Sequence, residues 1–218
     1  MREDVYGRYS ICNIYYDKDE DLLINRSMQK PSYKEKLRLR SYGTPDMNTK
    51  VFLEIKKKYR GIVNKRRISL QLQEAYDFVE RGIVPTFESS VEKQICEEIR
   101  FFLMRYSLKR RLYLAYDRLA FSGIDDPSFR VTFDTEIMSR RKNLGLEEGK
   151  YGVRLLPDQL YLMEVKIHGA TPLWFAKLLT EFGIRPVSFS KYGNIFKREH
   201  GAPLSWVTGM TDAEAVIV

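Results

Sequence analysis

The sequence is poor in the residues that build disulfide frameworks and many metal centres. Its 218 residues include two cysteines, Cys12 and Cys96, and two histidines, His168 and His200. Two cysteines cannot form a disulfide framework, and neither a CxxC motif nor a Cys/His metal spacing is present. We therefore expect two reduced, buried thiols, and we expect His168 to lie in a turn beside Gly169.

Long apolar runs and a leader sequence are also missing. The N-terminus, residues 1–4, has no apolar segment typical of signal peptides, and no uncharged run reaches the ~20 residues of a membrane helix. With 44% hydrophobic and 30% charged residues, the composition excludes a disordered tail, a collagen-like fibre and a coiled-coil rod. We expect one cytoplasmic domain over residues 1–218, without a membrane span of its own.

The sequence does contain an excess of basic charge, and this excess lies in one segment. The formal net charge is +8, and residues 30–70 contain thirteen lysines and arginines but only three acids. Outside this segment, acids slightly outnumber lysines and arginines. Such a concentration predicts a surface that faces a polyanion.

Hydrophobic periodicity and turn residues predict a protein with both strands and helices. Strands are expected at residues 9–16, 33–42, 51–59, 62–70, 111–121, 128–137 and 159–167. Helices are expected over 71–81, ended by Gly82, over about 91–106 after a capping box at Ser89-x-x-Glu92, and from Thr171 (N-cap) and Pro172 to Gly183. No pattern assigns a structure to the C-terminal tail, residues 198–218.

Several of these strands have one apolar and one charged face, because alternate residues of a strand share a face. In 33–42 the even positions hold Lys34, Lys36, Arg38 and Arg40, whereas Leu37 and Leu39 are odd. Neighbouring like charges repel, and a bound anion would relieve the repulsion, so the pattern favours anion binding over a solvated face. Strands closed into a barrel would form a cationic tunnel, and an open sheet would form a basic platform. Few aromatic residues share these faces, which argues for a phosphate-rich ligand and against base stacking.

Three acids lie on the same faces as basic residues. Glu54 shares a face with Lys56, Asp134 with Arg130, and Glu164 with Lys166. Interior ion pairing would explain this pattern, and so would a divalent metal such as Mg²⁺ or Mn²⁺, which binds carboxylate oxygens together with substrate phosphates. The pattern alone leaves both interpretations open.

Motifs carrying these charges resemble a known family. They are Tyr33-Lys-Glu-Lys-Leu-Arg-Leu-Arg40-Ser-Tyr-Gly, Phe52-Leu-Glu-Ile-Lys56-Lys-Lys, Lys65-Arg-Arg-Ile-Ser, Tyr116-Asp-Arg118, Phe129-Arg130-Val-Thr-Phe-Asp134, Leu162-Met-Glu164-Val-Lys166 and Phe189-Ser-Lys191-Tyr. In this order, over roughly residues 8–197, they resemble the VTC (vacuolar transporter chaperone) catalytic domain. This is the polyphosphate polymerase branch of the triphosphate tunnel metalloenzymes, which are related to CYTH domains, and the chain resembles its stand-alone bacterial form.

The resemblance implies an α+β fold, an antiparallel β-barrel with a basic tunnel and flanking helices. Family members bind a nucleoside triphosphate with Mn²⁺ or Mg²⁺, and the polymerase branch transfers the γ-phosphate of ATP to a growing polyphosphate chain. The sequence starts near the family's second strand, so the first strand is expected to be missing. The sheet edge left open predicts a homo-oligomer, and a membrane partner would be encoded elsewhere.

The resemblance also implies roles for individual residues. Phosphates would be bound by Arg38, Arg40, Lys56, Lys65, Arg118, Arg130, Lys166 and Lys191, with Lys34, Lys36 and Arg67 near the entrance. Metal would be bound by Glu164, with Glu54 and Asp134 as further candidates. Arg38, Arg40, Lys56 and Glu164 are the residues expected to carry catalysis.

Other functions compatible with the sequence are a triphosphatase, in which water replaces the acceptor phosphate, and a non-catalytic module that binds polyphosphate or nucleotides. A nucleic-acid binder is supported by basic charge and little else, so we expect no nucleic-acid partner.

Overall fold

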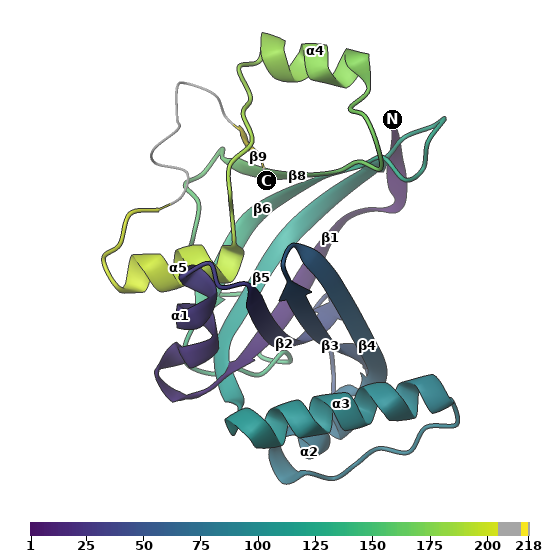
Figure 1. Cartoon of the computed structure of the whole chain (residues 1–218), viewed down its shortest axis with the longest axis vertical. Helices are drawn as coiled ribbons and strands as arrows, with labels where there is room; N and C mark the ends of the chain where they lie inside the picture. The colour runs from purple at the N-terminus through teal and green to yellow at the C-terminus, as the bar shows by residue number, and fades with distance from the viewer. Residues whose placement is uncertain (205–214, 218) are drawn as a thin grey trace. The chain divides into compact units, whose positions relative to one another are not determined.

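The computed structural model describes residues 1–204 and 215–217 (Figure 1). Its strands are β1 (Arg2–Asp17), β2 (Tyr33–Tyr42), β3 (Lys50–Tyr59), β4 (Ile62–Gln71), β5 (Lys109–Ser122), β6 (Arg130–Arg140), β7 (Val153–Arg154), β8 (Tyr161–Lys166) and β9 (Ala215–Ile217). Its helices are α1 (Leu22–Met28), preceded by a 3₁₀ turn η1 (Asp19–Asp21), α2 (Leu72–Arg81), α3 (Ser90–Tyr106), α4 (Leu173–Glu181) and α5 (Lys191–Glu199). The predicted α+β class is confirmed. Most of the predicted C-terminal tail, residues 205–214 and 218, lies outside the described residues.

The strands are linked by hydrogen bonds in the order β4-β3-β2-β1-β5-β6-β8-β9, with β7 paired to β6. The pairs β1–β2, β2–β3, β3–β4 and β6–β8 are antiparallel, and β8–β9 is parallel. Within residues 1–204 and 215–217, no ladder joins β4 to β9. The closed barrel implied by the resemblance therefore stays a prediction.

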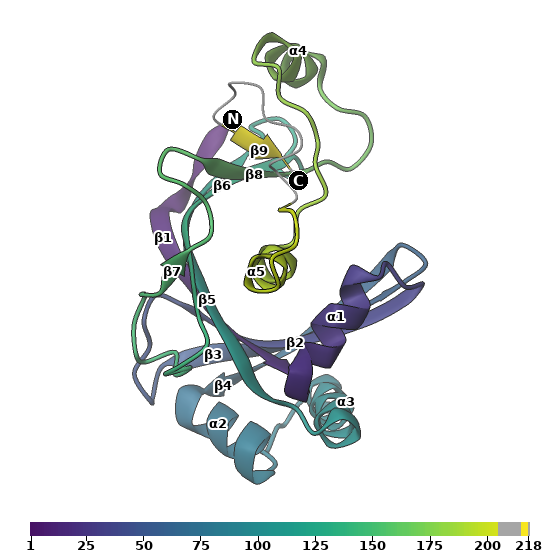
Figure 2. The same cartoon turned by 90° about the vertical axis from the view of Figure 1, so that its left-hand side faces the viewer.

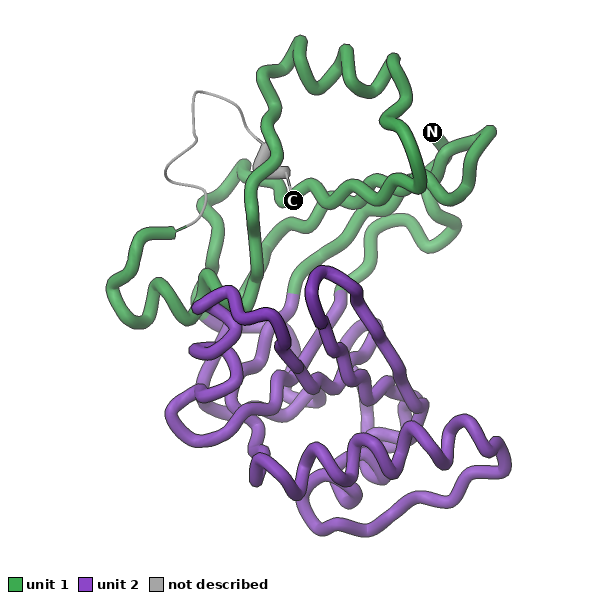
Figure 3. The backbone as a smooth tube through the Cα atoms, in the orientation of Figure 1, with its two compact units in different colours: residues 1–10, 116–138, 153–218 green, residues 11–115, 139–152 purple. Residues whose placement is uncertain are grey.

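The backbone divides into two compact units, coloured separately in Figure 3. Unit 1 comprises Met1–Ser10, Tyr116–Met138 and Val153–Val218, and unit 2 comprises Ile11–Ala115 and Ser139–Gly152. Strands β1, β5 and β6 contribute residues to both units.

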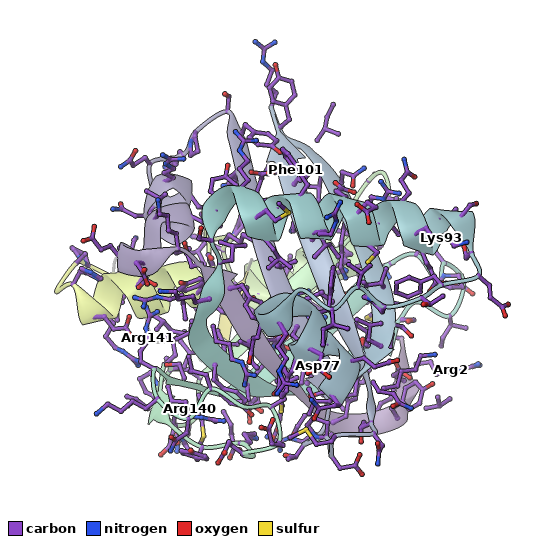
Figure 4. The ribbon with its side chains drawn as sticks, turned by 90° about the horizontal axis from the view of Figure 1, so that it is seen from below. Arg2, Asp77, Lys93, Phe101, Arg140 and Arg141 are labelled. Atoms are coloured by element: carbon purple, nitrogen blue, oxygen red, sulfur yellow. The ribbon has the colours of Figure 1, made fainter. Side chains whose placement is uncertain are left out.

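In unit 2, helices α2 and α3 lie on the same side of β2, β3 and β4, as Figures 2 and 4 show. The odd positions of β2 and β3 face these helices: Leu37, Leu39, Leu53 and Ile55 are at most 1% exposed and join one apolar core with residues of both helices. Most charges of these strands lie at even positions, and Glu35 and Lys57 are the exceptions. The predicted division into an apolar and a charged face is therefore confirmed, and the helices cover only the apolar face.

Unit 1 repeats this arrangement on β6 and β8. Phe129, Val131 and Met163 form an apolar cluster with Phe175 of α4. Helix α4 thus covers the apolar face of these strands, and the charged positions Asp134 and Glu164 belong to the other set of alternating residues.

The helix ends confirm some predicted signals and correct others. Gln71 precedes α2, its backbone N–H donates to Glu74 Oε2 (2.9 Å), and Gly82 ends the helix with φ = 72°, a left-handed conformation that glycine adopts without strain. The capping box predicted at Ser89 and Glu92 is wrong, because the Ser89 side chain makes no capping hydrogen bond. Pro172, not Thr171, is the N-cap of α4.

Two helices, the short strands β7 and β9 and part of β1 escaped prediction. Strand β1 begins at Arg2 rather than at residue 9. Helix α1 starts where Asp17 accepts hydrogen bonds from the N–H groups of Leu23 (2.7 Å) and Ile24 (3.0 Å). Helix α5 is a short helix whose apolar Tyr192, Ile195 and Phe196 stand at helical spacing, and it was not predicted. No described helix is long and apolar enough to cross a membrane.

Candidate functional site

The charged face of β2, β3 and β4 in unit 2 carries a set of cations that we call the basic ladder. Backbone register places Lys36, Lys56 and Lys65 directly opposite one another across three strands, and it places Lys34 opposite Lys58. The members of the ladder are Lys34, Lys36, Arg38, Arg40, Lys56, Lys58, Lys65 and Arg67. The structure thus brings together all the phosphate-binding candidates predicted from these three strands.

The row formed by Lys36, Lys56 and Lys65 is the most unusual part of the ladder. Like charges directly opposite on neighbouring strands are destabilising. Burial lowers the pKa of each of these lysines, and the surrounding cations, Arg38 among them, lower it further. A multivalent anion bound at this row would remove the repulsion, so the row is suited to phosphate oxygens.

On this face of β2, β3 and β4, which the structure describes in full, Glu54 is the only acid. Its side chain is 1% exposed and lies 2.6 Å from Arg38 Nε, 2.7 Å from Lys65 Nζ and 3.9 Å from Arg40 Nε. Burial would raise the pKa of Glu54, but these three cations lower it to about 2. Glu54 therefore forms interior ion pairs, one of the two interpretations that the sequence allowed. Within β2, β3 and β4, this face thus holds one carboxylate among many cations.

Two residues of β1 extend the ladder, and the sequence analysis missed both. Tyr15 lies opposite Arg38, and Asn13 lies opposite Arg40. Arg38 Nη1 donates to the Tyr15 hydroxyl (3.4 Å), and Arg40 Nε donates to Asn13 Oδ1 (3.0 Å). The available signal was the polar Asn13 inside a strand, since asparagine is depleted in strands.

A second set of charges lies in unit 1 and is called the paired cluster: Arg118, Asp134, Glu164 and Lys191. Arg118 donates to both oxygens of Asp134 (2.6 and 2.8 Å) and to Glu164 Oε2 (3.0 Å). Lys191, the first residue of α5, lies 2.6 Å from Asp134 Oδ2 and 2.7 Å from Glu164 Oε1. Its ammonium also lies 4.6 Å from the centre of the Tyr116 ring. Here two cations and two carboxylates satisfy one another.

The electrostatics of the paired cluster follow from this balance. Burial would raise the pKa of Glu164, but Lys191 and Arg118 lower it to about 2. Burial would lower the pKa of Lys191, yet Asp134, Tyr116 and Glu164 raise it above its usual value. Glu164 and Lys191 are thus charged at neutral pH.

Three predicted residues have further neighbours. Arg130 and Lys166 face each other across β6 and β8, and Arg130 Nη2 lies 3.9 Å from Asp4 Oδ2. The guanidinium of Arg67, opposite Glu54, lies 4.6 Å from the centre of the Phe52 ring.

The carboxylates can be compared with the needs of a divalent metal. Among the described residues, no group of three or more His, Cys, Asp or Glu side chains could hold a metal ion. Asp134 and Glu164, however, both contact Lys191 Nζ and therefore lie close together. Mg²⁺ and similar ions are commonly bound by one or two carboxylates, with water and substrate phosphates completing the shell. This pair fits such an ion when a phosphate ligand is also present.

Fold and charge together define an α+β protein whose mainly antiparallel sheet carries a strongly basic face. Residues 2–200 match the VTC domain family, so the chain belongs to this family. The resemblance predicted from the motifs is confirmed.

Two curated relatives are similar over part of the chain. The chain is 28% identical over 161 residues to vacuolar transporter chaperone complex subunit 4 of Trypanosoma brucei brucei, which covers 62% of this chain and 20% of that protein. The same subunit of Trypanosoma cruzi is 27% identical with the same coverage. The match thus spans about a fifth of each relative.

Two solved structures are similar at low sequence identity. A candidate adenylate cyclase from Bacillus halodurans has a TM-score of 0.49 and 17% identity, covering 86% of this chain and 81% of that one. A candidate adenylyl cyclase from Hippeastrum with a dominant triphosphatase activity has a TM-score of 0.42 and 14% identity, covering 94% and 80%. At these TM-scores the likeness carries no argument about activity.

Proposed function

We propose that this chain is a metal-dependent polyphosphate polymerase that transfers the γ-phosphate of ATP to a growing polyphosphate chain. The observation that carries the proposal is the row of Lys36, Lys56 and Lys65, flanked by Arg38 and Arg40 with Glu54 as the only acid on that face. Membership of the VTC domain family supports the same ligand class.

The basic ladder suits phosphoryl transfer, which depends on positioning and charge neutralisation more than on covalent help from the protein. Arginine forks bind two phosphate oxygens at once, and lysines supply compact charge. In the proposed reaction, an oxygen of the acceptor chain's terminal phosphate attacks the γ-phosphorus. The bond from that phosphorus to the β–γ bridging oxygen breaks, and ADP leaves with the bonding electrons.

The paired cluster would hold the metal within unit 1. We assign Glu164 and Asp134 this role because both carboxylates contact Lys191 Nζ. A bound Mn²⁺ or Mg²⁺ would neutralise phosphate charge and orient the transferred group. When phosphate arrives, Arg118 and Lys191 would bind its oxygens, which frees the carboxylates they now contact.

The finer predictions from the resemblance belong to the same proposal. These are a closed barrel, phosphate contacts by Lys65, Arg130 and Lys166, and entrance positions for Lys34, Lys36 and Arg67.

A second candidate function is a module that binds polyphosphate or nucleotides without turnover. The observation favouring it is that both carboxylates of the paired cluster are already engaged by Arg118 and Lys191. If these ion pairs persist when the ligand binds, the two carboxylates cannot coordinate a metal ion, and metal-dependent phosphoryl transfer does not occur.

Incubation of the purified chain with ATP and Mn²⁺, followed by gel analysis of polyphosphate and an assay of free phosphate, distinguishes these functions. Long chains are the expected product. Free phosphate alone would replace the polymerase by a triphosphatase, and neither product with triphosphate binding retained would support the binding module.

A matched pair of variants ties the result to the basic ladder. Lys56→Gln removes a ladder cation, whereas Lys57→Gln removes the next cation of the same strand, which is paired with Glu98 (2.6 Å) instead. Only the first change should reduce polyphosphate synthesis. Equal losses in both variants would contradict the assignment of the site.

A further inference from the structure

The tip of the β3–β4 hairpin in unit 2 exposes several large apolar side chains. Tyr59, Ile62 and Val63 of the hairpin are 50%, 76% and 48% exposed, and Tyr33, at the start of β2, is 43% exposed. Such residues are individually common on surfaces, but Tyr33, Tyr59 and Ile62 lie in direct register, and Val63 follows Ile62 in the chain.

Tyr33, Tyr59 and Ile62 share one face of the sheet, whereas Val63 lies opposite Lys58 on the other face. We call this end of the hairpin, together with Tyr33, the hairpin tip. Tyr59 lies opposite both Tyr33 and Ile62, and the two tyrosine rings are 6.5 Å apart. The turn uses Arg60 (φ = 45°) and Gly61 (φ = 91°), as tight hairpin turns require. The N–H of Arg60 donates to the carbonyl of Ser32 (2.8 Å), which ties the turn to the chain leading into β2.

The hairpin tip is also positively charged. Lys34 and Lys58 lie opposite each other beside Val63, Arg60 is in the turn, and Lys30 lies in the chain leading into β2. No acid occurs in residues 22–34 or 55–73. The next acid, Glu35, is 7% exposed and accepts hydrogen bonds from the hydroxyls of Tyr33 and Tyr106, so its charge is held inside unit 2.

We propose that the hairpin tip docks on a lipid bilayer that contains anionic phospholipids. Aliphatic and aromatic side chains that enter the boundary between headgroups and acyl chains, ringed by lysine and arginine, are the combination that binds such surfaces. Charge complementarity selects this occupant, because an uncharged protein surface would not use the cations and a nucleic acid would not use Ile62 and Val63. The inference does not depend on the proposed polymerase activity.

Another exposed apolar surface, on α4, shows why charge matters. Leu173 and Phe182 are 71% and 61% exposed, but the helix carries the acid Glu181 as well as Lys177. This surface is apolar but has no excess of cations. A substitution on α4 therefore serves as a control for the hairpin tip.

Cosedimentation of the full chain with vesicles tests the proposal. The chain is expected to bind vesicles of phosphatidylcholine with phosphatidylglycerol and to leave vesicles of phosphatidylcholine alone in suspension. Replacing Ile62→Ser and Val63→Ser together should weaken binding about tenfold, and Arg60→Gln should weaken it about fivefold. Leu173→Ser on α4 should leave binding unchanged.

Two further outcomes would overturn the proposal. If excess inorganic triphosphate released the chain while the tip variants bound like the wild type, the basic ladder would be the lipid-binding surface. If the wild type showed a larger mass in solution that the double variant lost, the hairpin tip would be a contact between copies of this chain.

A fluorescent label reports insertion directly. The native cysteines, Cys12 and Cys96, are buried, so Ile62→Cys offers an accessible thiol for an environment-sensitive dye. Its emission should shift to the blue with the anionic vesicles, and an unshifted spectrum on bound protein would overturn the insertion of the tip.

Discussion

The basic ladder and the paired cluster use the same residue types in opposite ways. In the ladder, cations crowd around Glu54 and the pKa values of Lys36, Lys56 and Lys65 fall. In the paired cluster, two cations meet two carboxylates and the pKa of Lys191 rises. A bound anion can relieve the repulsion among the cations of the ladder, whereas satisfied ion pairs stabilise the fold. We therefore expect the ladder to serve binding and the paired cluster to serve both stability and chemistry.

Removing the central carboxylate of the paired cluster should have the largest effect on stability. Asp134 is fully buried, and Asp134→Asn would leave Arg118 and Lys191 facing an amide. Loss of one partner of a buried pair costs about 3–5 kcal/mol, measurable by urea denaturation. Glu136→Gln, an exposed position of the same strand, should change stability by at most about 0.5 kcal/mol. A cost below about 1 kcal/mol for Asp134→Asn would show that the cluster does not support the fold.

Acid should weaken the protein through Glu54. Its pKa is about 2 in the folded chain, below the usual value of 4.5, because three cations favour the ionised form. A group whose pKa is lowered by folding adds stability above its unfolded pKa, and this stability disappears as the pH falls from about 4.5 towards 2. The full contribution is about 3 kcal/mol. Across this pH range, the free energy of unfolding should fall more steeply for the wild type than for Glu54→Gln. An equal dependence on pH in the two proteins would contradict the ion pairs at Glu54.

The third change separates chemistry from stability inside the paired cluster. In Glu164→Gln, Asp134 still pairs with Arg118 and Lys191, and the Glu164 side chain is 30% exposed, so the loss of stability should be about 1 kcal/mol. Metal-dependent turnover should fall by about a hundredfold, since even residues that only support metal ligands contribute about 10–100-fold. Turnover at the wild-type rate with Mn²⁺ would remove Glu164 from the proposed metal site.

Substitutions in the basic ladder should weaken ligand binding without lowering the stability of the fold. Lys56→Gln and Arg40→Ala should each weaken binding of inorganic triphosphate by about 1.5–3 kcal/mol, which titration calorimetry would measure. The stability of Lys56→Gln should stay the same or rise, because the row of Lys36, Lys56 and Lys65 loses a repelling charge. Lys57→Gln should keep the wild-type affinity. If neither Lys56→Gln nor Arg40→Ala changed affinity, the ladder would not be the phosphate site.

The basic ladder was largely predictable from the sequence, because side chains alternate between the two faces of a strand. Alternation placed Lys34, Lys36, Arg38 and Arg40 on one face, and the buried Leu37 and Leu39 confirm that face. The turn at residues 60–61 fixed which cations of β3 and β4 meet. Local pattern and long-range pairing agree here because a short hairpin determines register.

The paired cluster was predictable only in part. The motifs named Arg118, Asp134, Glu164 and Lys191, but no local pattern shows that Lys191, far along the chain, contacts both carboxylates. Its helix α5 is only nine residues long and buries Tyr192, Asn194 and Ile195, so tertiary packing supports this short helix. Whether Glu54 forms ion pairs or binds a metal depended on three-dimensional distances, which composition cannot give.

The smallest predicted effect tests how far the ladder extends onto β1. Tyr15 accepts a hydrogen bond from Arg38 (3.4 Å), and although burial raises its pKa, Arg38, Lys36 and Arg40 lower it below the usual value. Tyr15→Phe should weaken triphosphate binding at neutral pH by about 0.5–1.5 kcal/mol, the contribution of one hydrogen bond. At alkaline pH the affinities of the two proteins should converge, because an ionised Tyr15 would itself neutralise Arg38 and compete with phosphate. Calorimetric titrations at both pH values would measure this difference, and a gap that widens with pH would show that the Tyr15 hydroxyl acts outside the ladder.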